Sequence, residues 1–326
     1  MKSLVLCASL LLGLTGCVKS GLENYKNLVR ADVPVPPSAG VRVTYLGVNG
    51  YLLQSADATV LVDPYFTRIP PVPYLTSSHL VPDDERIRWG LRQVLGPSAH
   101  VDLILVTHAH PDHIFDVRPI AQKTGARIVA SPTGCNLLRA FSNPPPVRLE
   151  PILTPAATHG QPDGARQQTR RFGRVTVQAL EAEHDRLFGF PLYAGLRAHV
   201  PAEPKSATDW VCGEPLSYIV TMGGQRIFIA AGGISGPQQA GLAPVDLAIV
   251  GAALPDAQQC FRKTVDTLRP RYILPSHQDD FFIAPERGFH FGPKTDFGFV
   301  LRELKKTPDL TGRVILLDYF RPWTLR

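Results

Sequence analysis

The stretch that most constrains this chain is 101–115, which reads V-D-L-I-L-V-T-H-A-H-P-D-H-I-F. Its first six residues are apolar apart from Asp102, which is typical of a strand buried on both faces. Pro111 then prevents that strand from continuing. Three histidines and one aspartate fall within the six residues from His108 to His113. A loop of this composition, placed directly after a buried strand, indicates a reactive site.

The spacing of these side chains predicts a metal centre. Side chains two residues apart in an extended segment point the same way, so His108 and His110 can present nitrogen to one ion at about 2.0 to 2.1 Å. Asp112 and His113 begin an expected helix, 114–123, and face a slightly different point, which makes two adjacent metal positions possible. Asp112 as a helix N-cap alone is the simpler alternative. The cost of clustering unpaired polar groups at a buried strand end favours the metal.

Residues 107–113 resemble the T-H-x-H-x-D-H signature of the metallo-β-lactamase superfamily, which lies at a strand-to-helix turn. The resemblance implies an α/β fold, a four-layer αββα sandwich, that holds one or two Zn²⁺ ions between the edges of its sheets. It assigns His108 and His110 to the first metal, and Asp112 and His113 to the second.

Two later histidines complete the ligand set that the resemblance implies. His184 comes after the alternating segment 174–181 and matches the third histidine of the first metal. His277 comes after the strand-like segment 272–274 and matches the final ligand of the second metal. For His184, a turn residue facing solvent is the alternative.

Many members of this superfamily have a G-D-T-G segment whose aspartate bridges the two metals, whereas residues 230–235 here read A-A-G-G-I-S. Two zinc ions about 3.5 to 4 Å apart repel by about 15 to 20 kcal/mol at an effective dielectric of 20. We therefore expect one tightly bound Zn²⁺ and at most a weak second ion. Asp63, Asp185, Asp279 and Asp280 are the candidates to replace the bridge, although solvated turn carboxylates are the simpler interpretation of Asp279 and Asp280.

Asp63 lies at the end of the strand-like segment 59–62, before Pro64. By resemblance it orients one of the ligand histidines, and a turn-forming role before proline is the alternative. The run Asp63-Pro64-Tyr65, the long insertion after it and the Leu-Pro-Ser-His ending at His277 most resemble the branch that contains L-ascorbate-6-phosphate lactonase and N-acylphosphatidylethanolamine-hydrolysing phospholipase D.

These features predict a zinc-dependent hydrolase that acts on a phosphodiester, ester or lactone, with lipid-derived and small-molecule substrates both considered. Asp112 is the expected catalytic residue, because its carboxylate can orient the attacking water or accept its proton. His113 and His277 would hold a second ion or stabilise the developing oxyanion. The alternatives are a non-catalytic, ligand-binding lipoprotein with a degenerate metal site, and a small-molecule lactonase or β-lactamase.

The chain has 326 residues, 44% of them hydrophobic, which is enough for one large domain over 41–326. Segment 245–250 repeats the pattern of 101–106, as expected for an internally duplicated sandwich. Residues 67–100 form an insertion beside the expected site, and 188–214 have the composition of a lid. Apolar and alternating runs predict strands over 41–46, 51–54, 59–62, 101–106, 127–130, 174–181, 216–222, 226–230, 245–250 and 272–274, and helices over 84–95, 114–123, 133–140 and 256–268.

Residues 1–16 read as a lipoprotein signal peptide, because the apolar run that follows Lys2 is too short to span a bilayer and Leu-Thr-Gly precedes Cys17. Acylation of Cys17 with palmitate-type chains would anchor the protein, and residues 17–40 would form a proline-rich linker. We expect the protein in the bacterial cell envelope, at the outer membrane facing the periplasm.

The formal net charge of +6 comes without basic runs or aromatic-basic alternation, so nucleic acid is not an expected partner. After removal of the signal peptide and acylation of Cys17, three cysteines remain, Cys135, Cys212 and Cys260. An odd number of cysteines without paired spacing predicts free thiols. The oligomeric state is left open.

Overall fold

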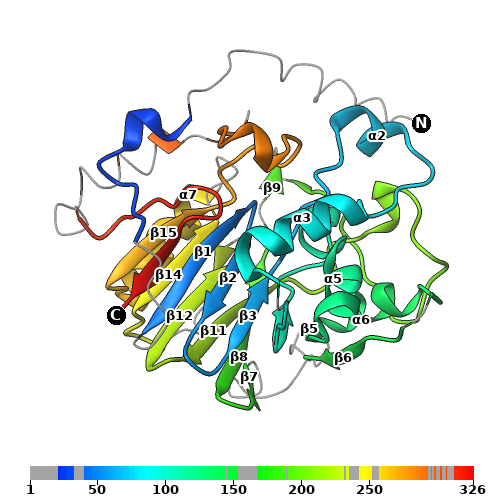
Figure 1. Ribbon diagram of the computed structural model, residues 1–326, viewed down its shortest axis with the longest axis horizontal. Helices are drawn as coiled ribbons and strands as arrows, with labels where there is room; N and C mark the ends of the chain where they lie inside the picture. Colours follow the sequence, from blue (N-terminus) through cyan, green and yellow to red (C-terminus); the bar gives the residue numbers. More distant parts are fainter. Residues whose placement is uncertain are drawn as a thin grey trace.

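The structure is a computed structural model, in which two mixed β-sheets pack face to face between helices (Figure 1). It describes residues 21–32, 40–97, 99–143, 145–152, 167–184, 186–187, 190–230, 233–234, 242–251, 257–292, 295, 297–298, 302, 306 and 312–326.

The first sheet has the strand order β16-β1-β2-β3-β4-β5-β6. The strands β1, β2 and β3 pair antiparallel, and β3 to β6 pair parallel. Its strands are β1 (Val41–Gly47), β2 (Gly50–Gln54), β3 (Thr59–Val62), β4 (Leu103–Leu105), β5 (Arg127–Ala130), β6 (Arg148–Pro151) and β16 (Pro322–Leu325).

The second sheet has the order β13-β8-β11-β12-β14-β15, and β7 pairs with β8. It repeats the plan of the first, because β8, β11 and β12 pair antiparallel while β12, β14 and β15 pair parallel. The expected internal duplication is therefore present. Its strands are β7 (Gln167–Phe172), β8 (Val175–Glu183), β11 (Leu216–Met222), β12 (Gln225–Ala230), β13 (Gly233–Ile234), β14 (Leu247–Gly251) and β15 (Tyr272–Ser276), beside a separate ribbon of β9 (Arg186–Leu187) and β10 (Phe190–Pro191).

Helices cover both outer faces of the sheet pair, which confirms the predicted αββα sandwich. In Figure 1, α3, α5 and α6 lie together on one side of the sheets, and α7 lies on the other side, against β14. The helices are α2 (Pro71–Thr76), α3 (Asp84–Leu95), α4 (Pro111–Ile114), α5 (Val117–Thr124), α6 (Pro132–Arg139) and α7 (Ala257–Leu268), with short 3-10 helices η1 (Leu22–Tyr25), η4 (Ala207–Asp209) and η6 (Pro285–Arg287).

Strand β4 shows how the sequence produces these layers. Successive side chains of a strand point to opposite faces. Leu103 and Leu105 accordingly join the core between the two sheets, whereas Ile104 joins the core between the first sheet and its helices. All three side chains are fully buried, so β4 is covered on both faces, as its continuous apolar run predicts.

Helix 114–123 was predicted as one element, and the structure corrects this. A short helix, α4, begins earlier, at Pro111, and α5 follows it. The interruption lies at Asp116, whose buried carboxylate accepts hydrogen bonds from the backbone N–H groups of Phe66 and Thr67 at 2.6 and 2.8 Å. The side chain is used to hold the loop after β3 rather than to cap α5, for which it makes no cap hydrogen bond.

Residues 21–32, expected in the linker, pack onto the sandwich. Leu22 is buried in the core between the sheets, Arg30 N–H donates to the carbonyl of Leu316 at 2.9 Å, and Asp32 accepts from Thr324 N–H at 2.6 Å. The folded domain therefore starts before Val41. The signal peptide, Cys17 and the proline-rich run 33–39 lie outside the described residues. Among those that are described, no helix is both long enough and apolar enough to cross a membrane.

Candidate metal centre

Six histidine and aspartate side chains come together at one edge of the sandwich, and four strand ends or turns deliver them. His108 and His110 lie in the loop after β4, and α4 carries Asp112 and His113. His184 follows β8 of the second sheet, and His277 follows β15. Because the two sheets pack face to face, the ends of β4, β8 and β15 meet, and residues up to 169 positions apart in the sequence become neighbours.

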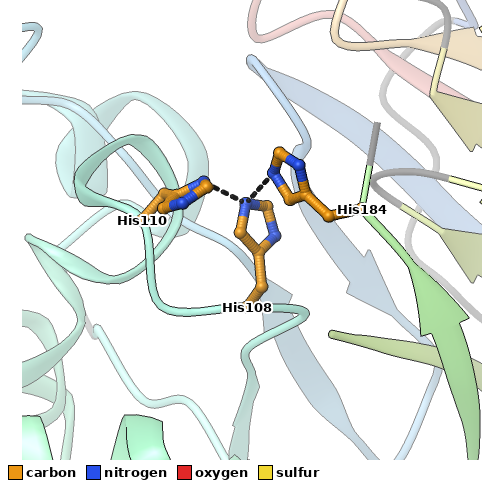
Figure 2. A group of neighbouring side chains, drawn as sticks. All are labelled: His108, His110 and His184. Carbon is orange, nitrogen blue, oxygen red and sulfur yellow. Dashed lines mark hydrogen bonds between the residues drawn. The ribbon is translucent and has the colours of Figure 1, made fainter. Parts of the chain in front are cut away.

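The first cluster consists of His108, His110 and His184, whose rings converge on a common point (Figure 2). His108 Nε2 lies 3.0 Å from His110 Nδ1 and 3.2 Å from His184 Nε2. The three facing nitrogens lie within 4.8 Å of one another. His108 and His110 are buried, and His184 is half-buried.

The outward nitrogens of two of these rings have acceptors, and these fix the tautomers. His110 Nε2 donates to the carbonyl oxygen of Leu192 at 3.1 Å. His108 Nδ1 lies 3.2 Å from Thr107 Oγ1, and that hydroxyl in turn donates to Asp63 Oδ2 at 2.5 Å. With the protons on these outward nitrogens, His108 Nε2 and His110 Nδ1 face each other as lone pairs. Such an arrangement is repulsive without a cation between them, and three neutral imidazoles fit a zinc-type ion.

The second cluster consists of Asp112, His113 and His277. Asp112 Oδ2 lies 3.1 Å from His277 Nε2 and 3.4 Å from His113 Nε2. His113 Nδ1 donates to Asp63 Oδ2 at 2.8 Å, which leaves His113 Nε2 facing the cluster. The clusters adjoin, because the His108 and His113 rings are 3.8 Å apart between centroids.

The electrostatics of the two clusters differ. Burial lowers the pKa of His110 to about 3, and the neighbouring histidines act in the same direction. Burial and the histidines around it also hold the pKa of His108 well below its usual value. Burial opposes protonation of His113 too, but Asp112 and Asp63 outweigh it and raise its pKa to about 10. The first cluster therefore offers neutral nitrogens, whereas the second contains the oppositely charged pair Asp112 and His113 before any ion binds.

Asp63 occupies the supporting position that the sequence suggested for it. Its carboxylate accepts hydrogen bonds from Thr107 N–H at 2.8 Å and from Asn49 Nδ2 at 2.8 Å, besides those from Thr107 Oγ1 and His113. It is fully buried and belongs to neither cluster. Asp63 thus orients one ring of each cluster and is not available to bridge them.

Asp279 is not a solvated turn carboxylate, and that interpretation was wrong. Its side chain and that of Arg68 are both fully buried and form an ion pair at 3.0 Å. Its carboxylate also accepts hydrogen bonds from Tyr319 OH at 2.5 Å, Tyr45 OH at 2.8 Å and Val48 N–H at 2.8 Å. With its oxygens occupied in this way, Asp279 supports the segment after His277 and is not a bridging ligand.

The other candidate bridges are not part of either cluster as described. The Asp280 carboxylate accepts the backbone N–H of Phe282 at 2.9 Å. Asp185 and Gly232 lie outside the described residues, and Gly233 pairs with Glu183 in a short β-bridge segment. Sequence analysis missed Arg68 and Leu192, and no local pattern marks either of them, since their partners lie 211 and 82 positions away.

Residues 43–189 match the family model described as Metallo-beta-lactamase superfamily. Similar curated proteins include a UPF0173 metal-dependent hydrolase of Carboxydothermus hydrogenoformans, 24% identical over 243 residues that cover 73% of this chain and 84% of the relative. Another, from Cupriavidus taiwanensis, is 29% identical over 268 residues that cover 76% of this chain and 78% of the relative.

Among solved structures, Igni18, a metallo hydrolase from the archaeon Ignicoccus hospitalis, aligns with a TM-score of 0.51 and 16% identity over 85% of this chain and 93% of that chain. This similarity concerns the fold and extends well beyond the residues that the family model matches.

Proposed function

We propose that this chain, in which residues 43–189 match the metallo-beta-lactamase superfamily model, is a metal-dependent hydrolase whose primary ion is a Zn²⁺ held by His108, His110 and His184. The observation that supports this most directly is the convergence of one nitrogen from each of the three rings to within 4.8 Å, with His108 Nε2 and His110 Nδ1 3.0 Å apart. The names of the relatives, metal-dependent hydrolases, agree with this assignment.

When bound, such an ion supplies Lewis-acid polarisation of the substrate and lowers the pKa of water. The chain's own groups then divide the remaining work. Asp112, whose pKa lies well below its usual value because His113 and His277 outweigh the effect of burial, is ionised and can orient a water molecule or accept its proton. His277 Nε2 and His113 Nε2 face the same space and can stabilise negative charge that develops on the substrate, or hold a second ion.

The substrate class proposed is a phosphodiester, ester or lactone. Each presents an electrophilic centre that a positioned water can attack, and each develops negative charge on an oxygen. The side chains of Asp112 and His277 are 12% and 14% exposed, whereas that of His113 is 1% exposed. Within the second cluster, we therefore infer that substrate approaches past Asp112 and His277.

The non-catalytic alternative is disfavoured by the buried support of the ligands. A site that had decayed to simple ligand binding would not need Asp63 to hold Thr107 and His113 together, at the cost of burying a carboxylate. Here Asp63 makes four hydrogen bonds, to Asn49, to His113 and two to Thr107. Networks of this type orient metal ligands and raise their basicity.

The decisive experiment combines elemental analysis of metal per chain with turnover assays on phosphodiester, ester and lactone panels, with and without chelator. We expect bound zinc, and turnover of at least one panel that chelation abolishes and added Zn²⁺ restores. His184→Ala should abolish both zinc binding and turnover, whereas His199→Ala, an exposed histidine in the segment beside the site, should leave both unchanged. Stoichiometric metal without turnover on any panel would favour the non-catalytic lipoprotein.

We further propose that the protein is anchored in the cell envelope through an acylated Cys17. The support in the sequence is the Leu-Thr-Gly-Cys run. Two or more acyl chains on that cysteine would give stable anchoring. Cys17→Ser should release the protein from membranes or leave it unprocessed, as cell fractionation and intact-mass analysis would show. An unmodified Cys17 in the mature protein would refute this proposal.

A further inference from the structure

Helix α2 is apolar and yet none of its residues is buried. Its sequence is P-V-P-Y-L-T, and Val72 is 69% exposed. No charged residue occurs from Ile69 to Ser78. A helix this short is not stable by itself in water, so tertiary contacts must stabilise it.

What holds α2 in place is an aromatic contact with the segment that follows His277. The ring of Tyr74 packs edge-on against Phe282 and Phe281, with centroids 5.7 and 6.3 Å apart. Phe281 and Phe282 lie 4.1 Å apart, and the ring of Phe281 lies 6.3 Å from that of His277. These contacts form a run of aromatic side chains that leads outward from the second cluster, which we call the apolar wall and define as Tyr74, Phe281 and Phe282.

The wall is held rigidly at its inner end. Arg68 Nη1 donates to the carbonyl of Asp280 at 3.2 Å, and Phe282 N–H donates to the Asp280 carboxylate at 2.9 Å. Asp279 is fixed at the same time by its ion pair with Arg68. The two phenylalanines are therefore placed by a buried network and do not pack at random on the surface. The three wall residues are half-buried, so part of each side chain remains accessible to a ligand.

We infer that the apolar wall receives the apolar arm of the substrate, and that the hydrolase proposed above acts on molecules that carry an alkyl or aryl chain next to the scissile bond. This inference rests on the proposed function. Its support is the position of the wall, which starts at a residue of the second cluster and continues outward without a charged side chain. A sugar or a phosphate arm would find no hydrogen-bonding partner among the wall side chains except the Tyr74 hydroxyl, whereas a hydrocarbon arm would remove apolar surface from water.

The size of the effect follows from burial. Complete burial of one methylene changes affinity about fourfold, and burial against one wall with the other side in water gives about half of that free energy, or roughly twofold per methylene. A chain six methylenes longer should then bind roughly sixtyfold more tightly, provided that it lies along the wall.

The test measures binding and does not depend on knowing the reaction. The full-length chain loaded with Zn²⁺ is titrated calorimetrically with alkyl hydroxamates from acetohydroxamate to octanohydroxamate, whose shared head group chelates the metal. We expect Kd to fall roughly twofold per added methylene. Phe282→Ala should reduce this dependence on chain length, while acetohydroxamate binds this variant and the unmodified chain equally. Val200→Ser replaces a valine that is 51% exposed outside the wall and should behave as the unmodified chain does.

The outcomes separate the two proposals. Tight acetohydroxamate binding with no dependence on chain length would overturn the apolar wall and leave the metal centre intact. Chain-length dependence that Val200→Ser reduces as much as Phe282→Ala would also overturn the assignment to this wall. No binding of acetohydroxamate by the zinc-treated protein would count against the metal centre itself, and therefore against the proposed function on which the inference rests.

Discussion

Replacing Asp279 with alanine should destabilise this protein severely, although the sequence alone gives the opposite expectation. The substitution leaves the Arg68 guanidinium buried without its partner, in a position where both side chains are fully excluded from solvent. It also removes the acceptor for Tyr319 OH, Tyr45 OH and Val48 N–H. Breaking a buried ion pair by removing one partner costs about 3 to 5 kcal/mol.

The assay is urea denaturation of the metal-free protein, so that metal binding does not contribute to the free energy of unfolding. At roughly 2 °C per kcal/mol for a large domain, a thermal scan should show a Tm lower by about 6 to 10 °C. Asp280→Ala is the matched control, since its carboxylate accepts a single backbone hydrogen bond from Phe282 and its loss should cost about 1 kcal/mol.

A third variant separates the effect of losing the ion pair on stability from the effect of leaving a cavity. In Arg68→Met combined with Asp279→Leu, no buried charge remains, so the double variant should recover the part of the stability that is lost with the ion pair, while Tyr319 OH, Tyr45 OH and Val48 N–H still lack their acceptor. If Asp279→Ala and Asp280→Ala lose the same small amount of stability, the buried network does not support the segment after His277 in the way described.

Four further results are expected. His110→Ala removes one of three neutral nitrogens and should abolish tight zinc binding, as measured by elemental analysis after dialysis; near-native zinc content would defeat the assignment. Asp63→Asn should weaken zinc affinity by about 10-fold to 100-fold, read by competition with a chromophoric chelator, because Thr107 and His113 lose a charged acceptor; an unchanged affinity would contradict the supporting role. The unmodified chain should hold about one tight zinc at micromolar free metal, and Gly232→Asp or Gly233→Asp should raise the affinity for a second ion; two equally tight ions in the unmodified chain would refute this and point to Asp185. Burial opposes ionisation of Asp279, but Arg68 and the tyrosine hydroxyls hold its pKa below the usual value. The stability that its ionised form contributes is therefore complete above about pH 4 and is lost as the pH falls further. Unfolding curves from pH 6 to pH 3 should show this loss in the unmodified chain and not in Asp279→Ala.

Local patterns predicted the elements that lie in the core. The strands Thr59–Val62, Arg127–Ala130 and Leu216–Met222 and the helix Asp84–Leu95 have the predicted bounds, because each is a short run whose apolar period matches one type of element. The predicted strand 101–106 is shorter at both ends, and β4 covers only Leu103–Leu105. Strand ends depend on pairing partners, and β3 and β5 pair with β4 over these three residues.

The candidate ligands and the supporting Asp63 were suggested by a contiguous motif and a resemblance, whereas the contacts through which Asp63, Arg68 and Leu192 support the site were not predicted. Thr107 lies inside the motif, but its contact with Asp63 depends on β3 and β4 pairing in parallel. Strands β1 and β16 lie near opposite ends of the sequence and pair with each other, with Val41 opposite Leu325. No feature of Pro322–Leu325 indicates this partner. In the sequence, Arg68 looks like a loop residue. Its burial follows from tertiary contacts, which local periodicity does not predict.

The hydrogen bond from His110 Nε2 to the carbonyl of Leu192 couples metal affinity to the segment 190–213. A carbonyl 82 residues away fixes which nitrogen of His110 carries its proton, so a rearrangement of that segment would change a ligand without touching the ion. The segment is also joined to the α2 region, since Leu80 N–H donates to the carbonyl of Lys205 at 2.6 Å. Coupling between two sites is reciprocal, so if the bound ion orders this segment, ordering of the segment raises the affinity for the ion. Amino-acid changes there would consequently be selected for their effect on metal retention as well as on the molecules admitted.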